Sequence, residues 1–229
     1  MGARGSSSHG GGGTVVNGVI GRDPHLQGYW EPDQSNQGRF DAYAYHEGKN
    51  FNRDIWDNVL ADNERRNIRY YTGSYYRQMD LHLRTGAGVS RDIIEYIHGA
   101  TSGMGKFRVP EEFVSYRGGG EDRGTAALLG GTVAQLSDAT FLRSKIGKIV
   151  TDKGFMSSAV HPTDAWSGIQ YKIYVNKGIS GMYVDPISVN QGEREFLFNR
   201  DTSFKIHGFK TDSSGKVEEI YLEAVRSKH

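Results

Sequence analysis

The chain has 229 residues with 36% hydrophobic content, enough for one substantial core, and its 28 basic and 27 acidic residues leave a formal net charge of +1. This near balance gives no global field that favours nucleic acid or a membrane surface as an obligate partner. Cysteine is absent, which excludes disulfides and thiolate chemistry, and no apolar run approaches the length that crosses a bilayer.

The first thirteen residues are rich in glycine and serine and lack an apolar segment. This composition is typical of a flexible leader or tag and not of a signal peptide. Residues 14–229 are expected to form a single domain. Its first part, residues 14–38, is interrupted by Gly, Pro and Asn and predicts an irregular lead-in.

A helical lobe is predicted over about residues 40–105. Apolar side chains recur at roughly helical spacing up to residue 83, with charged residues between them. The tetrapeptide Tyr71-Thr72-Gly73-Ser74 interrupts the pattern, so that Gly73 is expected to end one helix and Ser74 to start the next. A further helix is predicted from Ser90, as its N-cap, to about His98.

After Pro110 the pattern changes to alternating or continuous apolar runs separated by glycine-rich turns, which predicts a β core over about residues 110–229. Residues 126–142 are expected to be mixed, because Gly130-Gly131 argues against one unbroken helix. A helical lobe followed by strands without regular alternation predicts an α+β fold. The strands are expected at residues 113–117, 149–150, 154–158, 169–175, 181–184, 195–198, 204–209 and 217–224.

Three elements of the β core carry residue types suited to chemistry. Arg117 ends a strand beside Gly118, Ser157 lies in a strand that ends in hydroxyls, and Glu193 and Glu195 open an apolar run. A guanidinium fork can hold phosphate oxygens, and a glycine lets a ligand approach the backbone. A serine can hydrogen-bond a carboxylate and hold it in a productive orientation.

The two glutamates stand two residues apart, and residues i and i+2 of a strand project to the same face. Their carboxylates are therefore expected to point the same way and to start roughly 6 to 7 Å apart. That spacing suits two carboxylates that act on different atoms of one reaction centre. Each element alone also has a structural explanation, such as an ion pair, a wet strand end or a soluble edge strand.

The order of the three elements is more informative than any one of them. In this order and with these flanks, the chain resembles the R-S-E class of mono-ADP-ribosyltransferases over about residues 40–225. The segment Ile68-x-x-Tyr71-Thr72-Gly73 is similar to the helical-lobe motif of that family. The resemblance implies NAD as substrate and a helical lobe packed on a core of two antiparallel or mixed β-sheets.

The resemblance also assigns roles by position. It implies that Arg117 binds the NAD phosphates, that Gly118 contacts the nicotinamide amide and that Ser157 orients Glu195. Glu195 is expected to bond the nicotinamide ribose and to stabilise the oxocarbenium ion, and Glu193 to activate the acceptor. These three residues, Glu195, Glu193 and Ser157, are the expected catalytic set.

Two aromatic residues complete the expected NAD site. Tyr71 belongs to the helical-lobe motif, and Trp166 is the one aromatic residue of the loop over residues 161–168. Trp166 either stacks on nicotinamide or packs against the protein. No metal is expected, because the eight histidines lack any metal-binding spacing.

The resemblance implies transfer of ADP-ribose from NAD to a macromolecule by a toxin or effector that is secreted or delivered and acts in the cytosol of a target cell. The family associates the E-x-E motif with arginine acceptors on proteins. Three alternatives remain: an NAD glycohydrolase, transfer to nucleic acid and a non-catalytic NAD-binding module. The basic cluster of Arg65, Arg66, Arg69 and Arg77 permits the second, and the presence of Glu195 disfavours the third. A cognate immunity protein is a further expected partner.

Overall fold

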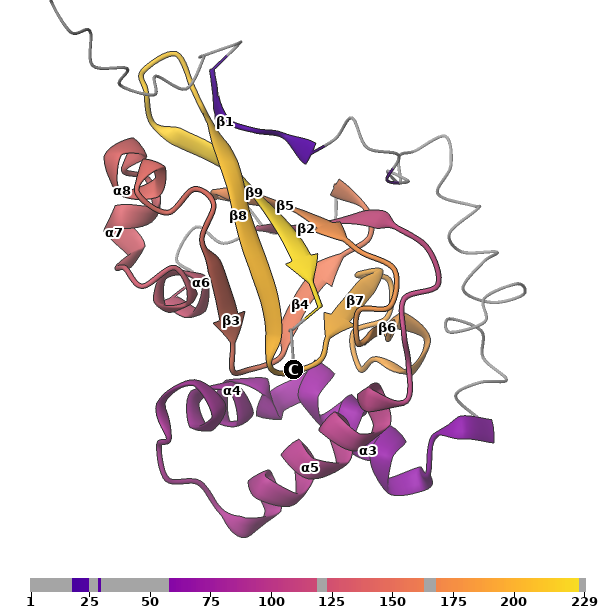
Figure 1. Ribbon diagram of the computed structural model, residues 1–229. Coiled ribbons are helices and arrows are strands. Elements are labelled where there is room, and N and C mark those ends of the chain that lie inside the picture. Colours follow the sequence, from indigo (N-terminus) through magenta and orange to yellow (C-terminus); the bar gives the residue numbers. More distant parts are fainter. Residues whose placement is uncertain (1–17, 25–28, 30–57, 119–122, 163–167, 227–229) are drawn as a thin grey trace, which may run out of the picture.

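The computed structural model describes residues 18–24, 29, 58–118, 123–162 and 168–226. The expected leader, most of the lead-in and the start of the helical lobe lie outside these described residues. A layer of helices packs against one end of a sheet (Figure 1). In the described residues, no helix combines the length and apolar character that crossing a bilayer requires.

The helical lobe consists of α3 (Asp62–Tyr70), the π-helical segment η3 (Tyr71–Tyr75), α4 (Tyr76–Thr85) and α5 (Arg91–Gly105). Helix α5 follows Ser90 as predicted but continues well past the expected end, because the buried Ala100 and Met104 extend its apolar stripe. The lobe core takes these buried residues from the helices: Ile68, Met79, Ile93, Ile97, Ala100 and Met104.

The predicted break at Gly73 is a kink inside a continuous helical path. Gly73 has φ −108° and ψ −116°, whereas the residues that flank η3 are helical. Helix α4 begins at Tyr76 with Tyr75 as its N-cap residue, so Ser74 does not start it as expected. Glycine tolerates such a backbone angle, and the chain therefore bends at this point without ending the lobe.

Nine strands of the described residues are hydrogen-bonded in the order β1-β8-β9-β5-β2-β4-β7-β6, with β3 paired to β8. Only β5 and β9 among these pairs are parallel, so the sheet is mixed. The strands are β1 (Val19–Gly21), β2 (Phe113–Gly118), β3 (Ile149–Asp152), β4 (Met156–Ala159), β5 (Gln170–Val175), β6 (Gly181–Tyr183), β7 (Glu195–Phe198), β8 (Thr202–Thr211) and β9 (Val217–Val225).

Two sheets were expected, whereas backbone pairing connects all nine strands in one sheet. Strands β2 and β4 pair at Tyr116 and Ala159, whereas β2 and β5 pair along six residues. The single pair joins a larger half that contains β2 to a smaller half of β4, β7 and β6. The predicted combination of a helical lobe with a mixed β core is confirmed.

Strand β7 separates two hydrophobic cores. Phe196 and Phe198 pack into the main core, where their rings lie 4.9 Å apart edge to face. Leu197 points to the other face and packs into the lobe core. Since alternate residues of a strand face opposite sides, a strand buried on both faces needs a continuous apolar run, which is the pattern that predicted it.

Two elements differ from expectation in detail. Val19–Gly21 was expected to be irregular but forms β1 on the edge of β8. The mixed segment contains three short helices, α6 (Arg123–Leu128), α7 (Val133–Leu136) and α8 (Ala139–Arg143), and the glycine pair separates the first two as predicted.

Candidate active site

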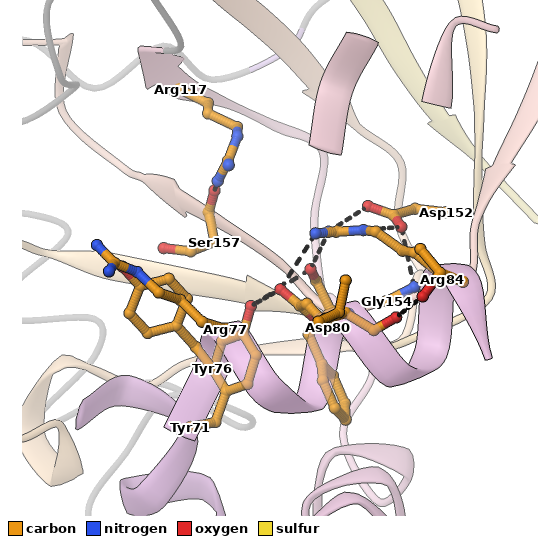
Figure 2. Close-up of polar contacts among 12 residues, drawn as sticks. Tyr71, Tyr76, Arg77, Asp80, Arg84, Arg117, Asp152, Gly154 and Ser157 are labelled. Atoms are coloured by element: carbon orange, nitrogen blue, oxygen red, sulfur yellow. Dashed lines mark hydrogen bonds and ion pairs between the residues drawn. The ribbon is translucent and has the colours of Figure 1, made fainter. Parts of the chain in front are cut away.

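Arg117 lies near the end of β2 and reaches toward β4. Its Nη1 donates a hydrogen bond of 2.6 Å to the backbone carbonyl of Ser157 (Figure 2). The side chain is half-buried, and Gly118 follows it as the last residue of the strand. The fold thus brings together the first two elements of the predicted motif.

Ser157 connects the arginine to the third element. Strand β4 pairs with β7 so that Ser157 lies opposite Leu197 and Ala159 opposite Glu195. Diagonal neighbours on adjacent strands are within reach of polar side chains. The side chain of Ser157 forms a hydrogen bond with the Glu195 carboxylate, and the hydroxyl of Ser158 donates to the carbonyl of Phe196.

Glu195 is a buried carboxyl group at the start of β7, only 6% exposed. Its pKa is raised to about 7, chiefly by burial, and the Ser157 hydrogen bond opposes the rise. The negative charges of Glu193 and Asp185 contribute to the rise, and the Arg117 guanidinium also opposes it. The group therefore changes charge near neutral pH, which is typical of a carboxyl that takes part in chemistry.

Glu193 lies close enough for its charge to raise the pKa of Glu195. The two side chains do not owe this proximity to the shared strand face that the sequence predicted. Strand β7 begins at Glu195, and the intervening Arg194 has a φ of +48°. Residue 193 is therefore outside the strand, and the alternation that predicted a shared face does not apply to it. Its side chain is exposed, in contrast to that of Glu195.

A buried carboxylate shapes the turn that carries Glu193. Asp185 Oδ1 accepts hydrogen bonds from the backbone N–H groups of Gly192 and Arg194, at 3.0 and 2.8 Å. Burial raises the pKa of Asp185, and these backbone bonds oppose the rise. Sequence reasoning missed this residue, because its partners are backbone groups seven and nine positions away.

The same loop is tied to the kink of the helical lobe. The N–H of Val189 donates to Thr72 Oγ1 at 3.1 Å, and Asn190 Nδ2 donates to the Thr72 carbonyl at 3.3 Å. A Cβ at Gly73 would lie 3.2 Å from the Val189 side chain, so glycine permits this close approach. The predicted tetrapeptide thus holds the loop that precedes the glutamates.

Tyr71 is a buried residue at the start of the π-helical segment η3. Its hydroxyl donates to Asp80 Oδ2 at 3.0 Å and contacts the Phe155 carbonyl at 3.3 Å. Burial raises the pKa of Tyr71 well above its usual value, and the charges of Glu195 and Arg117 also affect it. A direct contact of Tyr71 with NAD stays a prediction.

An ionic cluster anchors α4 to the connection between β3 and β4 (Figure 2). Arg84 bonds both carboxylate oxygens of Asp152, at 2.8 and 2.9 Å, and contacts Asp80 at 3.3 Å. Asp80 also accepts from the N–H of Phe155 at 3.0 Å, and burial raises its pKa to about 6. Arg84 lies in the last turn of α4, and no local sequence pattern reveals its partner 68 residues away.

The remaining predicted site residue, Trp166, lies outside the described residues. Within the described part of the chain, no group of three His, Asp or Glu side chains is arranged to hold a metal ion. The expectation that the protein uses no metal stays a prediction.

Comparisons with known proteins point to one family. A family model described as ADP-ribosyltransferase exoenzyme matches residues 48–229. Mono-ADP-ribosyltransferase C3 of Clostridium botulinum D phage is 25% identical over 169 residues, which cover 69% of this chain and 67% of that protein. Secreted exoenzyme S of Pseudomonas aeruginosa is 27% identical over 167 residues, covering 72% of this chain and 33% of that protein, so the chain spans about a third of this relative.

Solved structures share the fold. The C3 exoenzyme of Clostridium limosum superposes with a TM-score of 0.68 at 21% identity, over 89% of this chain and 100% of that chain. Exoenzyme S from Pseudomonas aeruginosa, solved with human 14-3-3 protein beta and carba-NAD, gives a TM-score of 0.58 at 20% identity, over 84% of this chain and 90% of that chain. The predicted fold class is confirmed.

Proposed function

Because the chain belongs to the ADP-ribosyltransferase exoenzyme family, whose members use NAD as substrate, we propose that it transfers ADP-ribose to arginine side chains of a protein. One observation carries the proposal: the backbone carbonyl of Ser157 holds Arg117, and the side chain of the same residue holds Glu195. A phosphate-binding cation and a buried carboxylate are thereby fixed about one serine.

In the proposed complex, Arg117 binds the diphosphate of NAD. A guanidinium presents its donors as a planar fork that matches phosphate oxygens, and one nitrogen of Arg117 is already fixed on the carbonyl of Ser157. Gly118 offers its backbone to the nicotinamide amide. The proposed roles of Tyr71 and Trp166 are supporting contacts to the same ligand.

Glu195 is proposed to stabilise the transition state of nicotinamide release. The N-glycosidic bond breaks, nicotinamide leaves with the bonding electrons, and the ribose becomes cation-like. An ionised carboxylate that is already oriented beside this centre lowers the barrier without reorganisation. The hydrogen bond from Ser157 supplies that orientation.

Glu193 is proposed to bind and deprotonate the acceptor. It is exposed at the site, whereas Glu195 is buried, so an arriving side chain can reach it. A carboxylate pairs well with a guanidinium and can take the proton that the attacking nitrogen loses. This division supports an arginine acceptor. The exposure of Glu193 also favours water as a second acceptor, which would give NAD glycohydrolase activity.

We also propose the biological setting of this activity. The relative from Pseudomonas aeruginosa is a secreted exoenzyme. By analogy, the present chain is proposed to act as a toxin or effector in the cytosol of a target cell, with a cognate immunity protein in the cell that produces it.

The test uses labelled NAD with arginine methyl ester, target-cell lysate or water alone as acceptor. Glu195→Gln is expected to lose both nicotinamide release and labelling by about a hundred- to a thousandfold. Glu193→Gln should lose labelling of the ester and of protein while it still releases nicotinamide. Glu95→Gln, which changes an exposed glutamate on α5, serves as the matched control.

Each acceptor has its own outcome. Label that is removed by nuclease and not by protease would show that the acceptor is nucleic acid and not protein. Nicotinamide release without any labelled product would show that the protein is an NAD glycohydrolase. Wild-type nicotinamide release by Glu195→Gln would contradict the assignment of Glu195 itself.

A further inference from the structure

A second ligand site is suggested by a cavity at the opposite end of β2 from Arg117. The cavity has a volume of about 550 Å³ and is lined by Arg108, Val109, Pro110, Lys177, Gly178 and Arg226. Strand β2 begins at Phe113, paired with Val175, and ends at Gly118, paired with Gln170. Five residue steps separate the two ends by roughly 16 Å, so this basic cavity is distinct from the proposed NAD site.

The floor of the basic cavity is a fixed piece of backbone. Val109 accepts a hydrogen bond from the N–H of Gly178 at 2.8 Å and donates to the carbonyl of Ile179 at 2.9 Å. These two bonds join the segment before β2 to the turn after β5. The cationic side chains therefore project from a paired scaffold and not from a loose loop.

Both arginines are held in place by backbone carbonyls. Arg226 Nη2 donates to the carbonyl of Lys177 at 3.0 Å, and Arg108 Nη1 donates to the carbonyls of Gly105 and Phe107, each at 2.7 Å. A guanidinium has five N–H donors, so donors remain on each for a ligand.

Gly178 makes room for this arrangement. Its φ is +86°, and a Cβ there would lie 2.0 Å from Arg226 Nη2. The positive φ favours glycine at this position, and the missing side chain leaves room for the Arg226 guanidinium against the turn.

Within the described part of the chain, no carboxylate forms an ion pair with Arg108, Lys177 or Arg226. Two guanidinium forks and one ammonium facing the same space suit a ligand with several anionic oxygens. The cavity is open to solvent, and its three basic side chains are exposed, so an anionic ligand can approach all three from outside.

We propose that the basic cavity binds a phosphate-bearing ligand with at least two phosphate groups. Such a group can belong to a free polyphosphate or to a phosphoinositide headgroup, and the chemistry of recognition is the same for both. Arg108 and Arg226 hold the phosphate oxygens, and Lys177 adds a mobile charge.

The test measures binding of inorganic pyrophosphate to the full chain by calorimetry, at two salt concentrations. Lys177→Gln/Arg226→Gln is expected to weaken binding about tenfold or more, because each change removes a charge-assisted hydrogen bond. Lys148→Gln/Arg143→Gln removes the same charge from exposed positions elsewhere and should bind like wild type. Lys177→Gln alone is the variant least prone to misfold, since this exposed side chain makes no hydrogen bond or ion pair with the described residues.

Two further arms identify the site and the source of the ligand. Arg117→Ala removes the diphosphate contact of the proposed NAD site and should keep the pyrophosphate binding that the Lys177/Arg226 variant loses. Vesicles of phosphatidylcholine with and without phosphatidylinositol 4,5-bisphosphate show whether a headgroup is bound. Binding of either source that is lost in the Lys177/Arg226 variant supports the proposal. Three outcomes would overturn it. The first is equal affinity in that variant and in its charge-matched control, the second is loss of binding in Arg117→Ala only, and the third is the absence of saturable binding to any probe.

Discussion

Arg117 is held by the backbone of Ser157 and not by its hydroxyl, at 2.6 Å from Nη1 to the carbonyl oxygen. The hydroxyl-bearing side chain bonds Glu195 instead. One residue therefore supports two functions through two chemically separate groups, and substitution of its side chain can separate them.

Ser157→Ala is predicted to lower kcat without a matching change in the KM for NAD. The substitution removes a hydrogen bond to a charged group, which corresponds to about a 10- to 100-fold loss in rate, while the carbonyl that holds Arg117 remains. Steady-state kinetics of nicotinamide release measure both constants. A rise in KM as large as that of Arg117→Ala would show that the arginine depends on the hydroxyl after all.

The kcat/KM for NAD is predicted to rise with pH and to level off above an apparent pKa of about 7. Below that pH Glu195 is protonated and cannot stabilise a cation. Glu193→Gln removes a charge that raises the pKa of Glu195, so its profile should move to lower pH. Ser157→Ala removes a bond that lowers the pKa, so its profile should move to higher pH. Shifts of the two profiles in the same direction would contradict this assignment.

Arg84→Met is predicted to lower the free energy of unfolding by about 3 to 5 kcal/mol. The change leaves Asp152, which is 3% exposed, and Asp80, which is 7% exposed, without their cationic partner. Urea denaturation measures the loss. Arg91→Met breaks an exposed pair with Glu95 and should cost less than about 1 kcal/mol. Equal costs for the two variants would mean that the buried cluster does not hold α4 to the sheet.

Thr72→Val is predicted to weaken transfer to an acceptor more than the release of nicotinamide to water. The substitution removes the oxygen that accepts from the N–H of Val189, and with it one tie on the loop before Glu193. Thr72→Ser keeps the oxygen and is the matched control. The measurement is the KM for arginine methyl ester, and an unchanged value in Thr72→Val would separate the loop from acceptor binding.

Much of the β core was predictable, because its strands carry local signals. The run at β7 and the order of Arg117, Ser157 and Glu195 were visible in the sequence, and register brings them together. The orientation of Glu193 was not predictable from alternation, since the φ of Arg194 interrupts the strand. The roles of Asp185 and of the Arg84 cluster were not predictable, because their partners are backbone groups or distant side chains and sequence periodicity carries no signal for such contacts.

The position of β7 between two cores limits which parts of this protein can be exchanged with those of a relative. The strand that begins with Glu195 contributes Leu197 to the lobe and Phe196 and Phe198 to the sheet core. A chimera that exchanges only one of these layers with a relative would create a cavity or an overlap on one face of β7 and shift the carboxylate at its start. The helical lobe and the sheet are therefore expected to be inherited as one unit, even where the surface loops diverge freely.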